Sequence, residues 1–384
     1  MTRDPRRILL VSFDDPRDPA TWSGVPYSVF RALERQVERI DVLTGVPVVR
    51  SAAHVGLHRL FGERRYPLWM TKPALVAFGR ALERMADDLE PDAIISISSQ
   101  YLVHCRSAVF ERFPTVMFSD APWELWQEAY RDFSKRRLLT GRYGRLEAKV
   151  ARRITGTVYA SDWAADWFTT RHRVPRHKLH VAPFGATMTP RSALAPRRAP
   201  QGVLRLLFVG VHWKRKGGPF AVEVTRALRT LGRDARLDVV GCSPQLDEAD
   251  RSFIEVHGVL PLNSPSRRES LEQLFGEAHL LVVPTRAECF GIVFAEAGAF
   301  GIPAVAGGVH AVPSVIEDGA NGLLVGERDD PRSVARRIHE LVADEGRYGR
   351  MAATARDRYE TRFKWDAFAR RLLDTLDGGG PRSR

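Results

Sequence analysis

Short apolar runs recur along this chain of 384 residues, and stretches compatible with helices separate them. Runs of this length, ended by turn residues, are typical of buried strands in a parallel sheet. The first series comprises residues 8–13, 39–44, 93–97, 115–119 and 156–160, and the second comprises residues 204–209, 235–240, 254–258, 279–283 and 303–306. Strands that alternate with helices predict an α/β fold with doubly wound parallel sheets.

A segment rich in proline and arginine, residues 189–200, separates the two series. Proline and charge between two patterned regions favour a linker. The chain is long enough for two domains of ordinary size. The sequence therefore predicts one domain on each side of this segment.

The chain is strongly basic, with 58 Lys and Arg against 46 Asp and Glu and a formal net charge of +12. Such an excess favours anionic partners: nucleic acid, an acidic membrane surface or phosphorylated ligands. No RNA- or DNA-binding motif accompanies the charge, so we expect no nucleic-acid partner.

The cysteines and the apolar runs indicate the cellular compartment in which the protein resides. Cys105, Cys242 and Cys289 lie far apart and form no C-x-x-C pair, which suits a reducing cytosol and disfavours a zinc site. The first apolar run is too short for a signal peptide, and none approaches the ~20 residues of a membrane helix. We expect a cytoplasmic protein whose membrane contact, if it has one, is peripheral at the inner face.

The most informative stretch is residues 284–297, where two glutamates stand eight positions apart. A predicted strand ends just before it, and a predicted helix begins at Gly291, so Glu288 lies in a turn and Glu296 within a helix. In open parallel sheets, ligands bind where strands end and helices begin. At 1.5 Å per residue, two helical positions this far apart would be ~12 Å from each other. A nucleotide-sugar fits such a span, whereas the alternative is a chance pairing of two common residues.

Two further features nearby suit phosphate groups. The amides of Phe290, Gly291 and Ile292 lie at the start of the helix, where N–H groups and the helix dipole attract anions. The strand at 204–209 ends in Gly210, and three cations follow at 214–216. Taken alone, that basic segment favours a solvated turn.

In this context the stretch 284–297 resembles the E-x7-E motif of retaining glycosyltransferases with the GT-B fold, family 4 type (glycosyl transferases group 1). The resemblance extends over nearly all of residues 155–376. It includes the segments 181–186, 208–218, 301–305, 307–308, 315–325 and 363–368. The first 150 residues match the family only in outline.

The resemblance implies two Rossmann-like domains that face each other across a cleft. Residues 1–190 would form the acceptor-side domain, residues 201–360 the donor-binding domain, and residues 361–376 a helix that returns to the first domain. The expected activity moves a sugar from a nucleoside-diphosphate sugar to a hydroxyl of a glycan, a lipid-linked or a small-molecule acceptor, with retention. The donor is a co-substrate, and neither a cofactor nor a metal is expected.

The family pattern also implies site residues. The catalytic group is Glu288 on the sugar hydroxyls, Arg215 and Lys216 on the leaving diphosphate, and Asp120 on an acceptor hydroxyl or the sugar. The donor-binding group is Glu296 on the ribose, Phe290, Gly291, Ile292, Gly210, Gly24 and Val259.

Three positions depart from the family pattern. Val211 stands where an arginine is usual, so that role passes to Arg215 or Lys214. Asp120 follows a strand where many relatives have a histidine nearby, and it could equally cap a turn. Ser314 stands where a glutamate is usual.

Other functions remain as alternatives. A sugar-nucleotide epimerase or a phosphorylase could use the same fold, and a non-enzymatic nucleic-acid-binding protein would explain the charge. Basic segments at 59–65 and 135–137 are compatible with weak, salt-sensitive binding to acidic lipid surfaces, and slightly more so with solvated helix faces.

Overall fold

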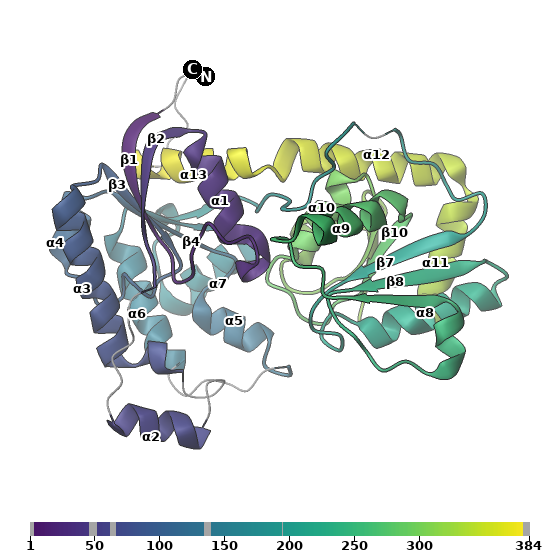
Figure 1. Cartoon of the computed structure of the whole chain (residues 1–384), viewed down its shortest axis with the longest axis horizontal. Coiled ribbons are helices and arrows are strands. Elements are labelled where there is room, and N and C mark those ends of the chain that lie inside the picture. Colours follow the sequence, from purple (N-terminus) through teal and green to yellow (C-terminus); the bar gives the residue numbers. More distant parts are fainter. Residues whose placement is uncertain (1–3, 46–51, 62–66, 134–139, 194, 379–384) are drawn as a thin grey trace. The chain divides into compact units, whose positions relative to one another are not determined.

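The computed structural model describes residues 4–45, 52–61, 67–133, 140–193 and 195–378 (Figure 1). The chain divides into two compact units. The amino-terminal unit combines Met1–Phe184 with Trp365–Arg384, and the carboxyl-terminal unit is the continuous segment Gly185–Lys364.

The amino-terminal unit contains a six-stranded parallel sheet in the order β2-β1-β3-β4-β5-β6. Its strands are β1 (Asp4–Val11), β2 (Val37–Leu43), β3 (Ala93–Ile97), β4 (Thr115–Ser119), β5 (Gly156–Tyr159) and β6 (Leu179–Val181). Its helices are α1 (Val25–Glu34), α2 (Ala52–Phe61), α3 (Lys72–Leu89), α4 (Ser107–Arg112), α5 (Trp123–Ala129), α6 (Thr140–Arg153), α7 (Asp162–His172) and α13 (Trp365–Leu376), with 3-10 turns η1 (Thr21–Gly24), η2 (Leu68–Met70) and η3 (Arg176–Lys178).

The carboxyl-terminal unit repeats this architecture with the order β12-β11-β10-β7-β8-β9, again parallel throughout. Its strands are β7 (Leu204–Val209), β8 (Ala235–Val240), β9 (Ile254–Gly258), β10 (Leu280–Val283), β11 (Ala304–Gly307) and β12 (Gly322–Val325). Its helices are α8 (Gly218–Thr230), α9 (Pro265–Glu277), α10 (Ile292–Ala299), α11 (Pro331–Ala343) and α12 (Glu345–Arg362), with 3-10 turns η4 (Glu248–Ser252) and η5 (Val312–Ser314).

In Figure 1, α9 and α10 cover one face of this second sheet, and α8 and α11 cover the other. The change of face follows from the strand order: the chain runs outward from β7 to β9 and then crosses back to β10. Every side chain of β10 is fully buried, as expected for a central strand that helices cover on both sides. The α/β class and the parallel sheets are therefore confirmed.

The α13 helix completes the core of the amino-terminal unit. Phe368 is buried, and its ring lies 5.3 Å from that of Phe118 on β4 and 5.2 Å from that of Phe184. A segment from the end of the chain is thus built into the sheet-and-helix layers formed by the first 184 residues.

The proline-rich segment 189–200 belongs to the carboxyl-terminal unit, since the division between units falls at Phe184 and Gly185. Its Arg197 side chain donates to four backbone carbonyls at the ends of α9 and α10. The acceptors are the oxygens of Phe275 at 3.0 Å, Gly276 at 2.6 Å, Ala278 at 3.3 Å and Phe300 at 3.0 Å. These hydrogen bonds hold the segment against the ends of α9 and α10.

Candidate functional site

The carboxyl ends of three neighbouring strands, β7, β10 and β11, carry the loops that build the candidate site. Parallel strands deliver these loops to the same edge of the sheet. The loop after β10, residues 284–291, is called the Glu288 turn below. Interactions between these loops define the site within the carboxyl-terminal unit.

Two cations from the loop after β7 meet the carboxylate of Glu288. Lys216 forms an ion pair with Glu288 Oε2, and Arg215 Nη1 lies 3.5 Å from the same oxygen. The three side chains are only 10–14% exposed. Arg215 also donates to the carbonyl of Ala287 at 2.7 Å, so it holds the backbone of the turn as well.

Two of the three cations of the 214–216 segment lie near Glu288. Arg215 and Lys216 are half-buried against the Glu288 turn, whereas Lys214 is exposed. The Val211 side chain is 69% exposed. The basic segment is therefore more than a solvated turn, because two of its cations point at a buried carboxylate.

Two glycines allow the loops to approach so closely. A Cβ at Gly210 would lie 2.8 Å from Cγ of Lys216, so the absence of a side chain leaves room for the lysine stem. Gly217 has a φ of +81°, and a Cβ there would lie 2.1 Å from the carbonyl oxygen of Pro284. Only glycine satisfies both the left-handed backbone and that contact.

The Glu288 turn leads directly into α10. Gly291 is the N-cap residue with a left-handed φ of +84°, and Ile292 is the first helical residue. Phe290 is 3% exposed, and its ring faces Phe363 at 6.4 Å. No acidic residue occupies the first turn, so the positive end of this helix is not neutralised from within it.

Glu296 lies inside α10, as predicted, and is 8% exposed. Its Oε1 accepts a hydrogen bond from the Met188 amide at 3.1 Å. Burial raises the pKa of Glu296 to about 7, and the charge of Lys216 acts in the opposite direction. Lys216 therefore acts electrostatically on both glutamates of the E-x7-E stretch.

The third loop, after β11, contributes a residue that sequence reasoning did not select. The Glu288 amide donates to Nδ1 of His310 at 3.3 Å. Burial lowers the pKa of His310, and the charge of Glu288 partly opposes that shift. The pairing of β10 with β11 brings this histidine to the turn, and a sequence pattern does not encode that proximity.

Val259 follows β9 at the edge of the same sheet, separated from β7 by β8. Its side chain is 65% exposed, and Gly258 before it has a left-handed φ of +66°. The backbone at this position is thus presented on an open loop.

The remaining predicted residues belong to the amino-terminal unit. Gly24 is the N-cap of α1 with a φ of 75°, and Trp22 and Ser23 before it also have positive φ. Asp120 follows β4, and its Oδ1 accepts from the amide of Ala121 at 2.9 Å and from Oγ of Ser119 at 3.3 Å. In this structure Asp120 caps its turn.

Tryptophans near Asp120 pack against each other. The rings of Trp123 and Trp126 stack at 5.2 Å with an angle of 9°, and Trp69 lies edge-on to Trp123 at 5.2 Å. Beside them Glu147 is fully buried and accepts from the amide of Trp123 at 2.9 Å. Burial raises the pKa of Glu147 to about 7.

Within the described residues, one group combines side chains that could ligate a metal: Asp238, Glu255 and His257 on β8 and β9. Nε2 of His257 lies 2.8 Å from Oδ1 of Asp238, and its Nδ1 lies 4.0 Å from Oε1 of Glu255. None of these three residues belongs to the group around Glu288.

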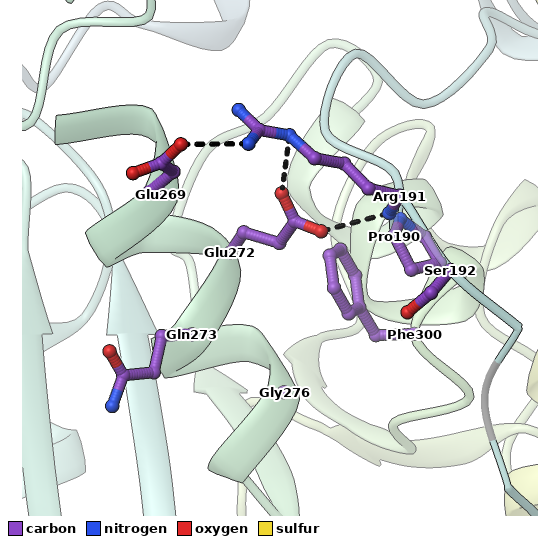
Figure 2. Close-up of a pocket in the computed structure, with 8 residues that line it drawn as sticks. All are labelled: Pro190, Arg191, Ser192, Glu269, Glu272, Gln273, Gly276 and Phe300. Carbon is purple, nitrogen blue, oxygen red and sulfur yellow. Dashed lines mark hydrogen bonds and ion pairs between the residues drawn. The ribbon is translucent and has the colours of Figure 1, made fainter. Parts of the chain in front are cut away.

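A shallow pocket of about 310 Å³ lies elsewhere on the unit, between α9 and the segment 190–192 (Figure 2). Arg191 lies across it and pairs with Glu269 at 2.9 Å and with Glu272 at 3.2 Å. No predicted site residue lines it.

Comparisons with known proteins show what the chain is similar to in sequence and in fold. The family model described as glycosyl transferases group 1 matches residues 204–344. A D-inositol 3-phosphate glycosyltransferase from Xylanimonas cellulosilytica is 34% identical over 215 residues, covering 51% of this chain and 50% of that protein. A protein of the same name from Stackebrandtia nassauensis is 31% identical over 220 residues, covering 53% and 49%. The matched segment spans about half the length of these curated relatives.

Solved structures resemble the whole chain. The sucrose-phosphate synthase of Thermosynechococcus elongatus aligns with a TM-score of 0.65 at 18% identity, covering 97% of this chain and 98% of that one. The Anabaena protein HepE in complex with UDP aligns with a TM-score of 0.66 at 15% identity, covering 97% and 99%. The chain therefore has the GT-B fold of two Rossmann-like domains, and its residues 204–344 are similar to the glycosyl transferases group 1.

Proposed function

We propose that this protein is a retaining glycosyltransferase that moves a sugar from a nucleoside-diphosphate sugar to a hydroxyl of an acceptor. The observation that carries the proposal is the convergence of Lys216 and Arg215 on Glu288, next to the start of α10. A buried carboxylate, two cations and a helix start suit the sugar and the diphosphate of such a donor. The D-inositol 3-phosphate glycosyltransferases are relatives with this class of activity by name.

In the proposed reaction, the bond between the anomeric carbon and the diphosphate oxygen breaks as the acceptor oxygen bonds to that carbon from the same face. The acceptor proton passes to an oxygen of the departing phosphate. Negative charge grows on the diphosphate, and preorganised cations lower that barrier. Lys216 and Arg215 supply this charge, so the reaction is proposed to proceed without a metal ion. Glu288 holds the sugar hydroxyls.

The acceptor is proposed to be a glycan, a lipid-linked glycan or a small molecule. Asp120 is proposed to orient an acceptor hydroxyl or the sugar, and Gly24 to bind the donor. A panel of UDP-, GDP- and ADP-sugars, scored for thermal stabilisation and for hydrolysis, identifies the donor. Stabilisation by oligonucleotides and by no nucleoside diphosphate would contradict the proposal and favour a nucleic-acid-binding protein. Conversion of the donor sugar to its epimer would favour the epimerase.

We expect Glu296→Gln to weaken binding of the matching nucleoside diphosphate by about 1.5–3 kcal/mol, because a charged hydrogen bond to the ribose becomes neutral. Isothermal titration at pH 8 measures this difference, since the carboxyl group, whose pKa burial raises to about 7, is then ionised. The wild-type advantage should shrink as the pH falls below about 7 and Glu296 becomes protonated. The fold should persist, because a glutamine oxygen can still accept from Met188.

Glu340→Gln is the matched control, since Glu340 is exposed on α11. It should bind the nucleoside diphosphate as the wild type does. Equal affinity of Glu296→Gln and wild type at pH 8 would remove Glu296 from the donor site.

We further propose peripheral contact with acidic membranes through α2. Among the described residues no helix is long and apolar enough to cross a membrane. On α2, Leu57, Leu60 and Phe61 are 38%, 74% and 36% exposed, and their spacing places them on one helix face. Arg59 beside them is exposed, whereas 62–65 and 135–137 of the two basic segments lie outside the described residues.

Flotation with vesicles that contain an anionic phospholipid should recover the protein at low salt and lose it at high salt. Each basic residue near such a surface contributes about 1 kcal/mol, and salt screens it over about 8 Å. Leu60→Glu should abolish flotation, whereas Leu231→Glu, at a site 42% exposed in the other unit, should not. No flotation at low salt would rule out the membrane contact and favour a soluble acceptor.

A further inference from the structure

His310 occupies the loop between β11 and η5 and adopts a left-handed φ of 51°. Left-handed backbone is uncommon for residues other than glycine and is tolerated best by asparagine, aspartate and histidine. The conformation coincides with the contact between its Nδ1 and the Glu288 amide. A side chain in a disfavoured backbone conformation therefore meets the turn that carries the central carboxylate.

We infer that His310 is a positioning residue, which holds the backbone of the Glu288 turn so that the carboxylate faces the donor sugar. The inference rests on the proposed function and deepens it. His310 acts through Glu288 and is not assigned a contact with substrate.

The hydrogen bond defines the state of the imidazole. An amide can only donate, so Nδ1 must be the unprotonated nitrogen and the ring proton must lie on Nε2. Burial lowers the pKa of His310, which favours this neutral ring near neutral pH. The charged group that acts on the ring is Glu288, whose carboxylate is paired with Lys216 and Arg215.

His310 completes a pair of supports on opposite sides of the turn. From the β7 side, Arg215 donates to the carbonyl of Ala287 at 2.7 Å. From the β11 side, His310 accepts from the amide of the next residue, Glu288. Since β10 lies between β7 and β11, the peptide group joining Ala287 and Glu288 is held through its oxygen on one side and its nitrogen on the other. This peptide sets the direction of the Glu288 side chain.

The test compares three substitutions at one position. His310→Asn places an amide oxygen near the position of Nδ1 and tolerates the left-handed backbone. His310→Gln is its matched control, because its longer side chain carries the amide nearer the position of Nε2. His310→Ala removes the acceptor.

We expect kcat for sugar transfer to fall roughly ten-fold in the Ala and Gln variants, which corresponds to the loss of one hydrogen bond. The kcat of the Asn variant should stay near that of the wild type. The ratio of wild-type to Asn activity should fall towards acid pH, where His310 is protonated and its Nδ1 no longer accepts. Both proteins retain Glu296, so its titration cancels in this ratio. Equal kcat in all three variants, with a pH-independent ratio, would overturn the positioning role.

Hydrogen exchange of the Glu288 amide separates this inference from the proposed function, because it needs no substrate. The Glu288 amide should lose its protection from exchange in the Ala and Gln variants and keep it in the Asn variant. If the wild type transfers no sugar but protection follows this order, the proposed function fails and the support by His310 stands. If the wild type is active and protection is the same in every variant, the support fails and the proposed function stands.

Discussion

Lys216→Ala is expected to lower the turnover of sugar transfer by about 10²–10³-fold, the usual cost of removing one preorganised group that stabilises charge in a transition state. Affinity for the donor should fall much less, because the charge on the diphosphate grows as the bond breaks. The substitution also leaves Glu288 with Arg215 as its remaining described cation, at 3.5 Å. Steady-state kinetics and titration with the nucleoside diphosphate measure the two effects separately.

Lys214→Ala is the matched control, because Lys214 lies two residues away in the same loop and is exposed. It changes the net charge equally and should leave turnover near wild type. Equal losses of turnover and affinity in Lys216→Ala, or no loss at all, would identify the loop as a solvated basic turn.

Arg197→Ala is expected to destabilise the carboxyl-terminal unit by about 3–4 kcal/mol. The substitution removes the donor to four carbonyls at the ends of α9 and α10, and the three part-buried ones, those of Phe275, Ala278 and Phe300, each carry a desolvation cost when left without a partner. Arginine near a helix end also interacts favourably with the helix dipole. Hydrogen exchange of the α9 and α10 amides under increasing urea measures the opening of this unit.

Arg198→Ala provides the comparison for charge, since Arg198 is the next residue and is exposed. In this variant the α9 and α10 amides should exchange as they do in the wild type. If these amides are as well protected in Arg197→Ala as in the wild type, the carbonyls have found other partners. The segment 189–200 would then contribute little to the stability of the unit.

Much of this fold could be predicted from apolar runs alone. The predicted bounds of β3, β4, β7, β8 and β9 coincide with those observed. Two strands were missed, β6 and β12, which are short and lie at the outer edges of the two sheets. β6 has only three residues, one of them a histidine, and β12 begins with a glycine, so neither forms a distinct apolar run.

The candidate site could be predicted in part. The turn at Glu288 and the helix around Glu296 follow from a local strand-turn-helix pattern, and the structure confirms both placements. His310 could not be found in this way, because its role depends on which strand lies beside β10. The segment 189–200 has the composition of a linker, yet the bonds of Arg197 tie it to helices about eighty and one hundred residues further along the chain.

Because the amino-terminal unit is built from two separate segments, its core cannot be completed when its first segment leaves the ribosome. A ribosome releases residues 1–184 before the carboxyl-terminal unit, but the helix that supplies Phe368 and Leu372 to the same core emerges only after that unit. The carboxyl-terminal unit is continuous and can fold as soon as it has emerged, in keeping with domains folding as units. Part of the apolar surface of the nascent amino-terminal sheet therefore stays uncovered until α13 has followed the carboxyl-terminal unit out of the ribosome.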